Sequence, residues 1–246
     1  MLAGDAENVL KPFLTANWRY LAMVNFVVDP ALLAPHVPVG TELDFFNGKT
    51  YISIVGFLFY HTLVMGLPIP RHRNFEEVNL RFYVRKKSAD TWRRGVCFIR
   101  ELVPRTAIAV TARVFYGEPY QALPMRSQVI DRDGEVSARY EWRRGTTWES
   151  LEMTARGEAQ SIAAGSHEEF IAEHTWGYTR RGQQTSEYRV EHARWKIWTA
   201  ETFGLRADVA TLYGAKFVTP LSVTPESAFM ADGSFVTVFR RDSARE

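Results

Sequence analysis

The sequence contains one cysteine, Cys97, among its 246 residues. A single thiol cannot form an intramolecular disulfide, and it cannot supply a cysteine-rich zinc site. Cys97 lies in the apolar run 96–99, which favours a small buried hydrophobic residue over a nucleophile. The six histidines show neither His-x-His nor His-Glu-x-x-His spacing. The sequence therefore indicates no protein-bound metal.

An excess of one charge is also lacking, since 30 lysines and arginines face 28 acidic residues. This balance argues against nucleic acid or an anionic membrane as the main partner. No apolar run reaches the ~18 residues that a membrane span needs. The N-terminal segment carries Asp5 and Glu7 and has no long apolar stretch. We therefore expect no signal peptide and a cytoplasmic protein.

Three sequence motifs of cofactor and hydrolase sites are missing as well. The chain contains neither Gly-x-Gly-x-x-Gly nor Gly-x-x-x-x-Gly-Lys, and it lacks Gly-x-Ser-x-Gly. The first two absences argue against a bound nucleotide, and the third argues against a serine-hydrolase nucleophile elbow. We expect no cofactor.

What is present predicts one mostly β domain over residues 1–246. Hydrophobic residues make up 46% and aromatic residues 13% of the chain, which is enough for a sizeable core without disulfides or a structural metal. No repeat or linker interrupts it. Short helices are expected after Asp29-Pro30, over residues 104–116 up to Gly117, and after Ser166. Strands are predicted over residues 18–28, 42–46, 51–59, 75–85, 95–102, 127–130, 136–143, 147–155, 188–190, 195–198 and 235–239.

Turns and loops complete this prediction. We expect turns at Asn47-Gly48, over the charged residues 86–94 and at Asp232-Gly233. The stretch 66–74 contains two prolines, so we expect an irregular loop there. Many strands with a few short helices indicate an α+β fold whose sheet is curled or closed into a barrel.

The first candidate site is the charged stretch from Arg71 to Glu77. One interpretation is an anion clamp of Arg71 and Arg73 beside an acid or base, which would be His72, Glu76 or Glu77. The alternative is a solvated turn whose charges pair with one another. Because strand residues of even spacing share a face, Glu77 and Arg81 predict a polar strand face.

Two further groups invite a functional interpretation. Glu101 ends an apolar strand, so it is either paired with an arginine in a structural ion pair or part of a site. The aromatic stretch that holds Trp176, Tyr178, His192 and Trp195 suits a pocket lining and suits a half-buried sheet nearly as well.

Several motifs resemble the YqjF-like family of uncharacterised bacterial proteins, and together they span most of residues 17–240. The motifs are Met23-Val24-Asn25-Phe26, Asp29-Pro30-Ala31-Leu32-Leu33, His36-Val37-Pro38, the stretch 71–81, Phe98-Ile99-Arg100-Glu101-Leu102-Val103-Pro104, Tyr116-Gly117-Glu118-Pro119-Tyr120, Glu173-His174-x-Trp176-Gly177-Tyr178-Thr179 and Tyr188-x-Val190-Glu191-His192-x-x-Trp195.

More remotely, the chain resembles acetoacetate decarboxylase, which implies a cone-like β-barrel around a buried site. That enzyme forms a Schiff base on a lysine beside a second lysine. The resemblance implies such a pair just after Leu102, but residues 103–107 contain Arg105 and no lysine. Arginine stays protonated and cannot replace the amine. Lys216, between Ala215 and Phe217, is the remaining Schiff-base candidate. For Arg19 the resemblance implies a carboxylate-binding role.

Two hypotheses follow for a polar pocket that takes a small organic acid or carbonyl compound. The first is a decarboxylase-like lyase that works by acid–base chemistry without the lysine pair. The second is a binding protein without catalysis; an interaction module would instead need a large exposed apolar patch. A homo-oligomer is left open. The candidate catalytic residues are Arg19, His72, Glu76 and Glu101, and the candidate substrate-binding residues are Arg71, Arg81, Tyr120, Trp176, Tyr178 and His192.

Overall fold

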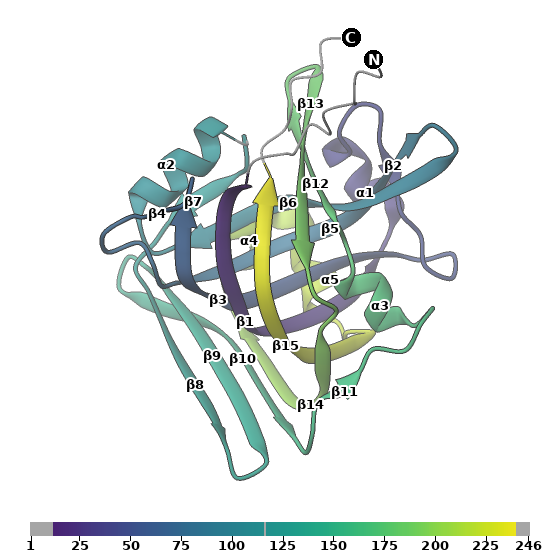
Figure 1. Ribbon diagram of the computed structural model, residues 1–246. Coiled ribbons are helices and arrows are strands. Elements are labelled where there is room, and N and C mark those ends of the chain that lie inside the picture. Colours follow the sequence, from purple (N-terminus) through teal and green to yellow (C-terminus); the bar gives the residue numbers. More distant parts are fainter. Residues whose placement is uncertain (1–11, 116, 240–246) are drawn as a thin grey trace, which may run out of the picture.

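The computed structural model describes residues 12–115 and 117–239, and all strands of these residues belong to one extensive sheet (Figure 1). The predicted end of the second helix at Tyr116, and the segment considered for a signal peptide, lie outside the described residues. The strands are β1 (Pro12–Val28), β2 (Glu42–Leu43), β3 (Thr50–Val64), β4 (Leu67–Pro68), β5 (Phe75–Ser88), β6 (Thr91–Val103), β7 (Tyr120–Ala122), β8 (Met125–Arg132), β9 (Glu135–Arg144), β10 (Thr147–Arg156), β11 (Gln160–Ser161), β12 (Trp176–Arg181), β13 (Gln184–His192), β14 (Lys196–Arg206) and β15 (Ser227–Phe239). The helices are α1 (Pro30–Leu33), η1 (Ala34–His36), α2 (Thr106–Phe115), α3 (His167–Ala172), α4 (Val209–Tyr213), η2 (Ala215–Phe217) and α5 (Val218–Ser222).

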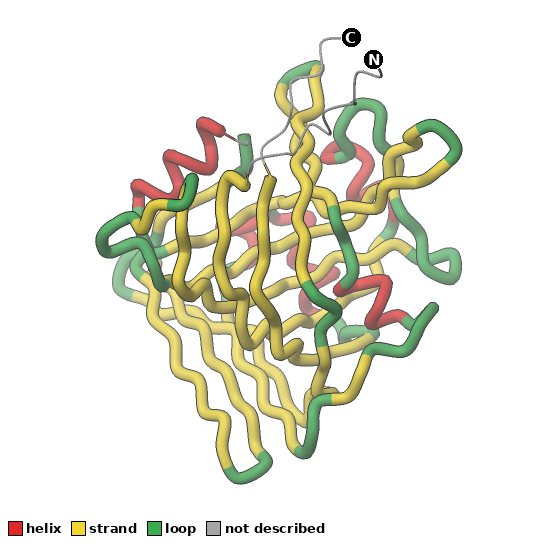
Figure 2. The backbone as a smooth tube through the Cα atoms, in the orientation of Figure 1, coloured by secondary structure: helices red, strands yellow, loops and turns green. Residues whose placement is uncertain are grey.

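Part of the sheet closes into a ring, which confirms the predicted curled barrel. The ring runs in the order β1-β3-β5-β6-β12-β13-β15, and β15 pairs back onto β1 (Figure 2). The closing pair is antiparallel and extends from Leu14 opposite Val238 to Asn25 opposite Ser227. The pairs β6–β12 and β6–β7 are parallel, so the sheet is mixed.

The remaining strands extend the sheet beyond the ring. From β15 the order continues through β14, β10, β9 and β8. Tyr140 of β9 packs against the ring at Gly56 of β3, where an added Cβ would lie 2.5 Å from the Tyr140 ring. The Tyr140 hydroxyl also donates a hydrogen bond to the Tyr20 carbonyl at 2.6 Å. Glycine at position 56 therefore lets the extension pack closely on the ring.

Strand alternation sorts the side chains of the ring into two apolar layers. On β5, Val78, Leu80 and Phe82 belong to the cluster that also contains Tyr140 and Trp142 of the extension. Residues of the other parity, such as Phe75 and Tyr83, belong to a second cluster with Phe57 and Phe170. The second cluster surrounds the interior of the ring, where the candidate site lies.

Two predicted helix starts are confirmed by their capping hydrogen bonds. The Asp29 carboxylate accepts from the Ala31 amide at 2.8 Å, and the Ser166 hydroxyl accepts from the Glu169 amide at 3.1 Å. Both pairs satisfy backbone donors that the first helical turn leaves free. In the described part of the chain, no helix has the length and apolar character needed to cross a membrane.

Four details of the predicted elements were wrong. The Asp232-Gly233 turn does not form, since β15 runs through both residues. The charged turn 86–94 is mostly strand, because β5 and β6 extend to Ser88 and Thr91. β2 pairs with β5 and not with β3, although the predicted Asn47-Gly48 turn does form and is closed by an antiparallel bridge between Phe46 and Lys49. The loop 66–74 contains the two-residue strand β4. The sequence also did not predict strand β12 or the helices α4, η2 and α5.

Candidate functional site

A cavity of about 210 Å³ lies inside the ring, and most of its wall is apolar. Aromatic rings form one side: Trp18 contacts Phe57 edge to face at 5.2 Å between centroids, and Phe59 stacks on Phe75 at 4.4 Å. Such a wall suits the apolar body of a small molecule.

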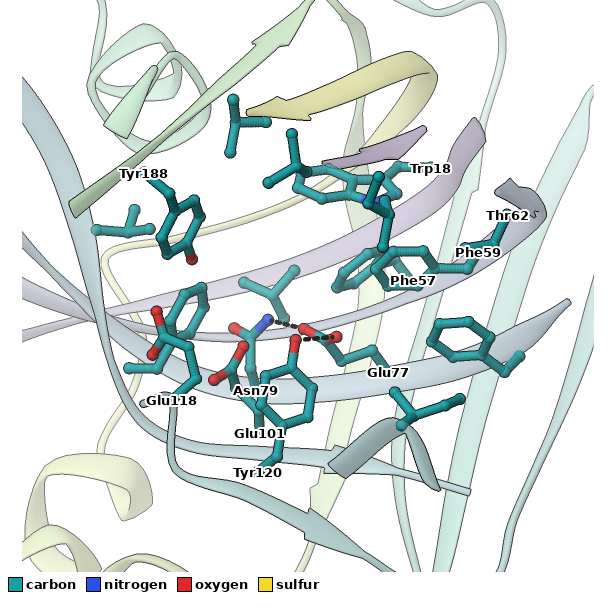
Figure 3. A pocket seen from close by; sticks show the side chains of 18 of the residues that line it. Trp18, Phe57, Phe59, Thr62, Glu77, Asn79, Glu101, Glu118, Tyr120 and Tyr188 are labelled. Carbon is teal, nitrogen blue, oxygen red and sulfur yellow. Dashed lines mark hydrogen bonds between the residues drawn. The ribbon is translucent and has the colours of Figure 1, made fainter. Parts of the chain in front are cut away.

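Three glutamates line the cavity together at the opposite end (Figure 3). Glu77 lies on β5, Glu101 on β6, and Glu118 just before β7. Strand pairing brings these elements together, since Asn79 lies opposite Glu101 and Glu101 lies opposite Tyr120. All three glutamates are buried, with at most 3% of their surface exposed. We call Glu77, Glu101, Glu118 and Tyr120 the acid cluster.

Hydrogen bonds satisfy only part of the acid cluster. Glu77 accepts one bond from the Tyr120 hydroxyl and one from the Asn79 side-chain amide, both at 3.0 Å. Oε2 of Glu101, both carboxyl oxygens of Glu118 and Oδ1 of Asn79 have no hydrogen-bond partner among the described residues. Buried acceptors without partners are costly, so these atoms mark where a ligand or water would be stabilised.

Burial shifts the pKa of every acidic group in the cluster upward. The pKa of Glu77 rises to about 7, although hydrogen bonds from Asn79 and Tyr120 and the charge of Arg81 counteract the rise. The pKa of Glu118 rises to about 8, with opposing contributions from the Thr179 and Tyr188 hydroxyls. For Glu101, burial and the neighbouring charges of Glu118 and Glu77 raise the pKa well above its usual range. At neutral pH the cluster therefore holds protonated carboxyl groups that can donate protons.

Arg81 and His174 also line the cavity. Arg81 is 9% exposed and donates from Nη2 to the Ile171 carbonyl at 3.0 Å. The His174 ring lies 4.8 Å from the Tyr83 ring, and burial followed by the charges of Arg94 and Arg81 lowers its pKa well below its usual range. His174 is thus a neutral imidazole in this environment.

Tyr188 enters the cavity from β13 because its neighbour on β12 has no side chain. Gly177 pairs with Tyr188 across the two strands. A Cβ at position 177 would lie 2.1 Å from Cζ of the Tyr188 ring, well inside contact distance. The glycine therefore makes room for the phenol near Glu118.

Six of the predicted site residues line the cavity, and Glu101 and Tyr120 belong to the acid cluster. His72 is half-buried, with Nδ1 2.7 Å from the Pro70 carbonyl oxygen. The His192 ring stacks on Trp195 at 4.2 Å. The six residues are His72, Arg81, Glu101, Tyr120, Trp176 and His192.

The other five predicted residues do not line this cavity. Glu76 is on the other face of β5 and accepts from the Ser127 hydroxyl at 2.9 Å. The Arg19 guanidinium lies 5.5 Å from the Tyr20 ring, and Arg71 is exposed in a loop. Tyr178 is fully buried in the outer apolar layer.

Lys216, the fifth of these residues, is exposed in η2, and its Nζ lies 2.6 Å from Nε2 of His36. The cavity wall includes no lysine within the described residues. In the same part of the chain, no group of three or more His, Cys, Asp or Glu side chains could hold a metal ion.

At the acidic end of the cavity, the predicted set lacked Asn79, Glu118 and Tyr188. Asn79 lies between Glu77 and Arg81 on the predicted polar face of the strand, so strand alternation could have identified it. Glu118 belongs to the motif Tyr116 to Tyr120, whose conformation no local pattern indicated. Among the described residues Glu101 has no ion pair with an arginine, and the charged groups that act on it there are Glu118 and Glu77.

Solved structures with similar folds are acetoacetate decarboxylases and related enzymes. Acetoacetate decarboxylase from Legionella pneumophila has a TM-score of 0.62 at 13% identity, over 98% of this chain and 90% of that one. An acetoacetate decarboxylase-like enzyme from Sphingomonas wittichii RW1 has a TM-score of 0.60 at 15% identity, over 98% of this chain and all of that one. The enduracididine biosynthesis enzyme MppR has a TM-score of 0.64 at 12% identity, over 96% of this chain and 89% of that one. The chain therefore has the acetoacetate decarboxylase-like fold.

The sequence identifies the family within this fold. Residues 15–234 match DUF2071, a family of uncharacterized conserved proteins, and the chain belongs to it. The uncharacterized protein YqjF of Bacillus subtilis (strain 168) is 32% identical over 113 residues. That match covers 46% of this chain and 45% of the relative's own length.

Proposed function

We propose that the cavity binds a small carbonyl compound or organic acid and that the acid cluster catalyses proton transfer at the carbon next to the carbonyl group. One observation supports the proposal above the others. Three buried carboxyl groups, two of them with unpartnered oxygens, converge at one end of an otherwise apolar cavity. Carboxyl groups whose pKa values approach neutrality are suited to act as general acids and bases.

The chemistry requires one carboxylate and one carboxylic acid. The carboxylate removes a proton from the carbon next to the carbonyl, and the C–H electron pair becomes the carbon–carbon double bond of an enol. A protonated carboxyl group of the acid cluster supplies the proton that the carbonyl oxygen gains. Neighbouring carboxyls favour this division of roles because they cannot all ionise together. The step balances without a further reactant.

An enol is also the immediate product when a β-keto acid loses CO2 or when a carbon–carbon bond next to a carbonyl is cleaved. The proposal therefore includes a lyase that uses carboxyl groups where a Schiff-base enzyme uses an amine. The cavity wall supports this choice, because it includes no lysine in the described chain. We expect borohydride treatment with β-keto and α-keto acids to leave the intact mass unchanged. A stable adduct on Lys216 would instead restore Schiff-base chemistry.

Hydrogen exchange in D2O tests the proposal directly. Ketones and keto acids are incubated with the protein, and NMR follows the exchange of protons next to the carbonyl. We expect Glu101→Gln and Glu118→Gln to slow exchange roughly 10²-fold or more, as for loss of a general acid or base. Glu76→Gln is the matched control, because Glu76 lies on the opposite face of β5. Absence of exchange and of CO2 release for the whole panel would refute a catalytic role.

A binding protein without catalysis is the second candidate, and the aromatic wall around Trp18 and Phe57 favours it. A binding protein needs shape and an anchor, with no acid or base at the reactive atom. A compound from the same panel would then raise the melting temperature of the protein without any proton exchange.

A further inference from the structure

The acidic end of the cavity contains buried hydrogen-bond acceptors that have no partner within the described chain. Asn79 and Tyr120 each donate one hydrogen bond to Glu77. Four buried acceptor atoms there remain unpartnered within the described chain, on Glu101, Glu118 and Asn79. The indole N–H of Trp18 is an unpartnered donor, but it lies on the opposite wall (Figure 3). A ligand that donates several hydrogen bonds would satisfy the acidic end best.

The charges around the cavity also favour a ligand that donates hydrogen bonds. Among the described residues that line it are three carboxyl groups and one guanidinium, that of Arg81, which donates to the Ile171 carbonyl. A bound cation would let the carboxyls ionise and pair with it, whereas an anion would require them to stay protonated. The aromatic wall that faces the acid cluster can hold the apolar body of the same molecule.

We infer that the substrate carries a basic nitrogen, protonated when bound, which donates hydrogen bonds to the carboxyl groups of Glu101 and Glu118. The ligand class is a small amine or amidine with an apolar body, and for the reaction it also carries a carbonyl group. This inference rests on the proposed function only for the carbonyl group, since the binding of the nitrogen can be measured without turnover.

Proton release on binding distinguishes this ligand class from an organic acid. The titratable and charged groups that act on the two carboxyls come from several elements: Glu77 of β5, Cys97 of β6, Tyr120 of β7, Arg181 of β12 and Tyr188 of β13. Arg81 of β5 acts in turn on Glu77. A cation promotes ionisation of the carboxyl groups, so its affinity should rise from pH 6 to pH 8 with release of protons. A carboxylate ligand needs protonated carboxyl groups, so its affinity should fall over the same range.

The experiment is calorimetric titration with benzylamine, benzyl alcohol and benzoate as matched probes, in two buffers of different ionisation enthalpy. We expect benzylamine to bind at least tenfold more tightly than benzyl alcohol and to release protons. Glu118→Gln should remove most of this preference, and Glu76→Gln should keep it. Equal binding of the amine and the alcohol, or tighter binding of benzoate with proton uptake, would overturn the inference.

A second comparison separates this inference from the proposed function. Hydrogen exchange is measured on aminoacetone and on butanone. An amine preference in the titration without exchange of either ketone would retain the inference and refute the proposed reaction. Exchange of butanone without any amine preference would retain the reaction and refute the inference.

Discussion

Glu118 shows how burial at one position changes the chemistry of a carboxyl group. It is 3% exposed, and its pKa rises to about 8, chiefly because burial disfavours the charged form. By contrast, the pKa of Glu141 on β9, which is 8% exposed, is lowered, chiefly by its hydrogen bond from Arg126. Two glutamates of one chain thus respond to their surroundings in opposite directions.

The raised pKa predicts how stability depends on pH. Between pH 4.5 and 8 the folded protein keeps a proton on Glu118 that the unfolded chain has lost, so the free energy of unfolding should fall as pH rises. A shift from 4.5 to about 8 corresponds to a loss on the order of 5 kcal/mol at most. Urea denaturation across pH 5–9 should therefore show a shallower decline for Glu118→Gln than for the wild type. The exposed Glu158→Gln is the control, and an unchanged decline in Glu118→Gln would contradict the assignment.

Gly177 gives a second prediction at the scale of one residue. An alanine there would place its Cβ 2.1 Å from the Tyr188 ring, which must then leave its position near Glu118. We expect Gly177→Ala to lower the free energy of unfolding by about 1–3 kcal/mol, as overpacking does, and to weaken ligand binding in the cavity. Gly204→Ala on β14 is the matched control, since no atom lies within 4 Å of its added Cβ. Equal effects of the two changes in thermal denaturation would show that Tyr188 does not depend on the glycine.

At the scale of elements, the pairing of β1 with β15 closes the ring, and Gly233 is its tightest point. Its φ is +81°, and an added Cβ would lie 2.0 Å from the Trp18 carbonyl oxygen. Gly233→Ala should therefore lower the free energy of unfolding by roughly 3 kcal/mol, whereas an alanine strained only by a positive φ costs about 1 kcal/mol. Gly134→Ala isolates the φ contribution, because Gly134 has φ +75° and open space around it. Similar urea midpoints for both variants would contradict a special role of this contact.

Local patterns predicted many of the elements, but the cavity depends on which face of a strand a residue occupies. Glu76 and Glu77 are neighbours in one charged stretch, yet only Glu77 lines the cavity. On β1, Trp18 likewise lines the cavity, whereas its neighbour Arg19 does not. Because strand side chains alternate, an error of one residue exchanges the inner and outer faces.

Long-range pairing explains why Glu118 could not be predicted. Its place in the cluster follows from the parallel pairing of β7 with β6, where Tyr120 lies opposite Glu101. Neither the helix before it nor the short strand after it carries a local signal for that pairing. Glu101 was recognised from the sequence, but the pattern did not indicate that carboxyl groups, those of Glu118 and Glu77, act on it within the described chain.

At the scale of the whole molecule, Cys97 can report global unfolding. It is the sole cysteine and is 3% exposed on β6, and burial raises the pKa of its thiol. A thiol reagent such as DTNB should reach it only when the fold opens, so labelling should be at least ~10³-fold slower than in denaturant. A ligand that binds the folded state should slow labelling further. Fast labelling of the folded protein would instead indicate local opening of β5 and β6.

The closure of the ring by its first and last strands has a consequence for synthesis in the cell. About 200 residues separate the end of β1 at Val28 from the start of β15 at Ser227. At about 5–20 residues per second, a ribosome needs roughly 10–40 s to make that stretch. During this interval one edge of β1 has no partner strand, and the apolar interior stays open to water. The nascent chain therefore exposes an unpaired sheet edge, open to wrong pairing, until translation reaches β15.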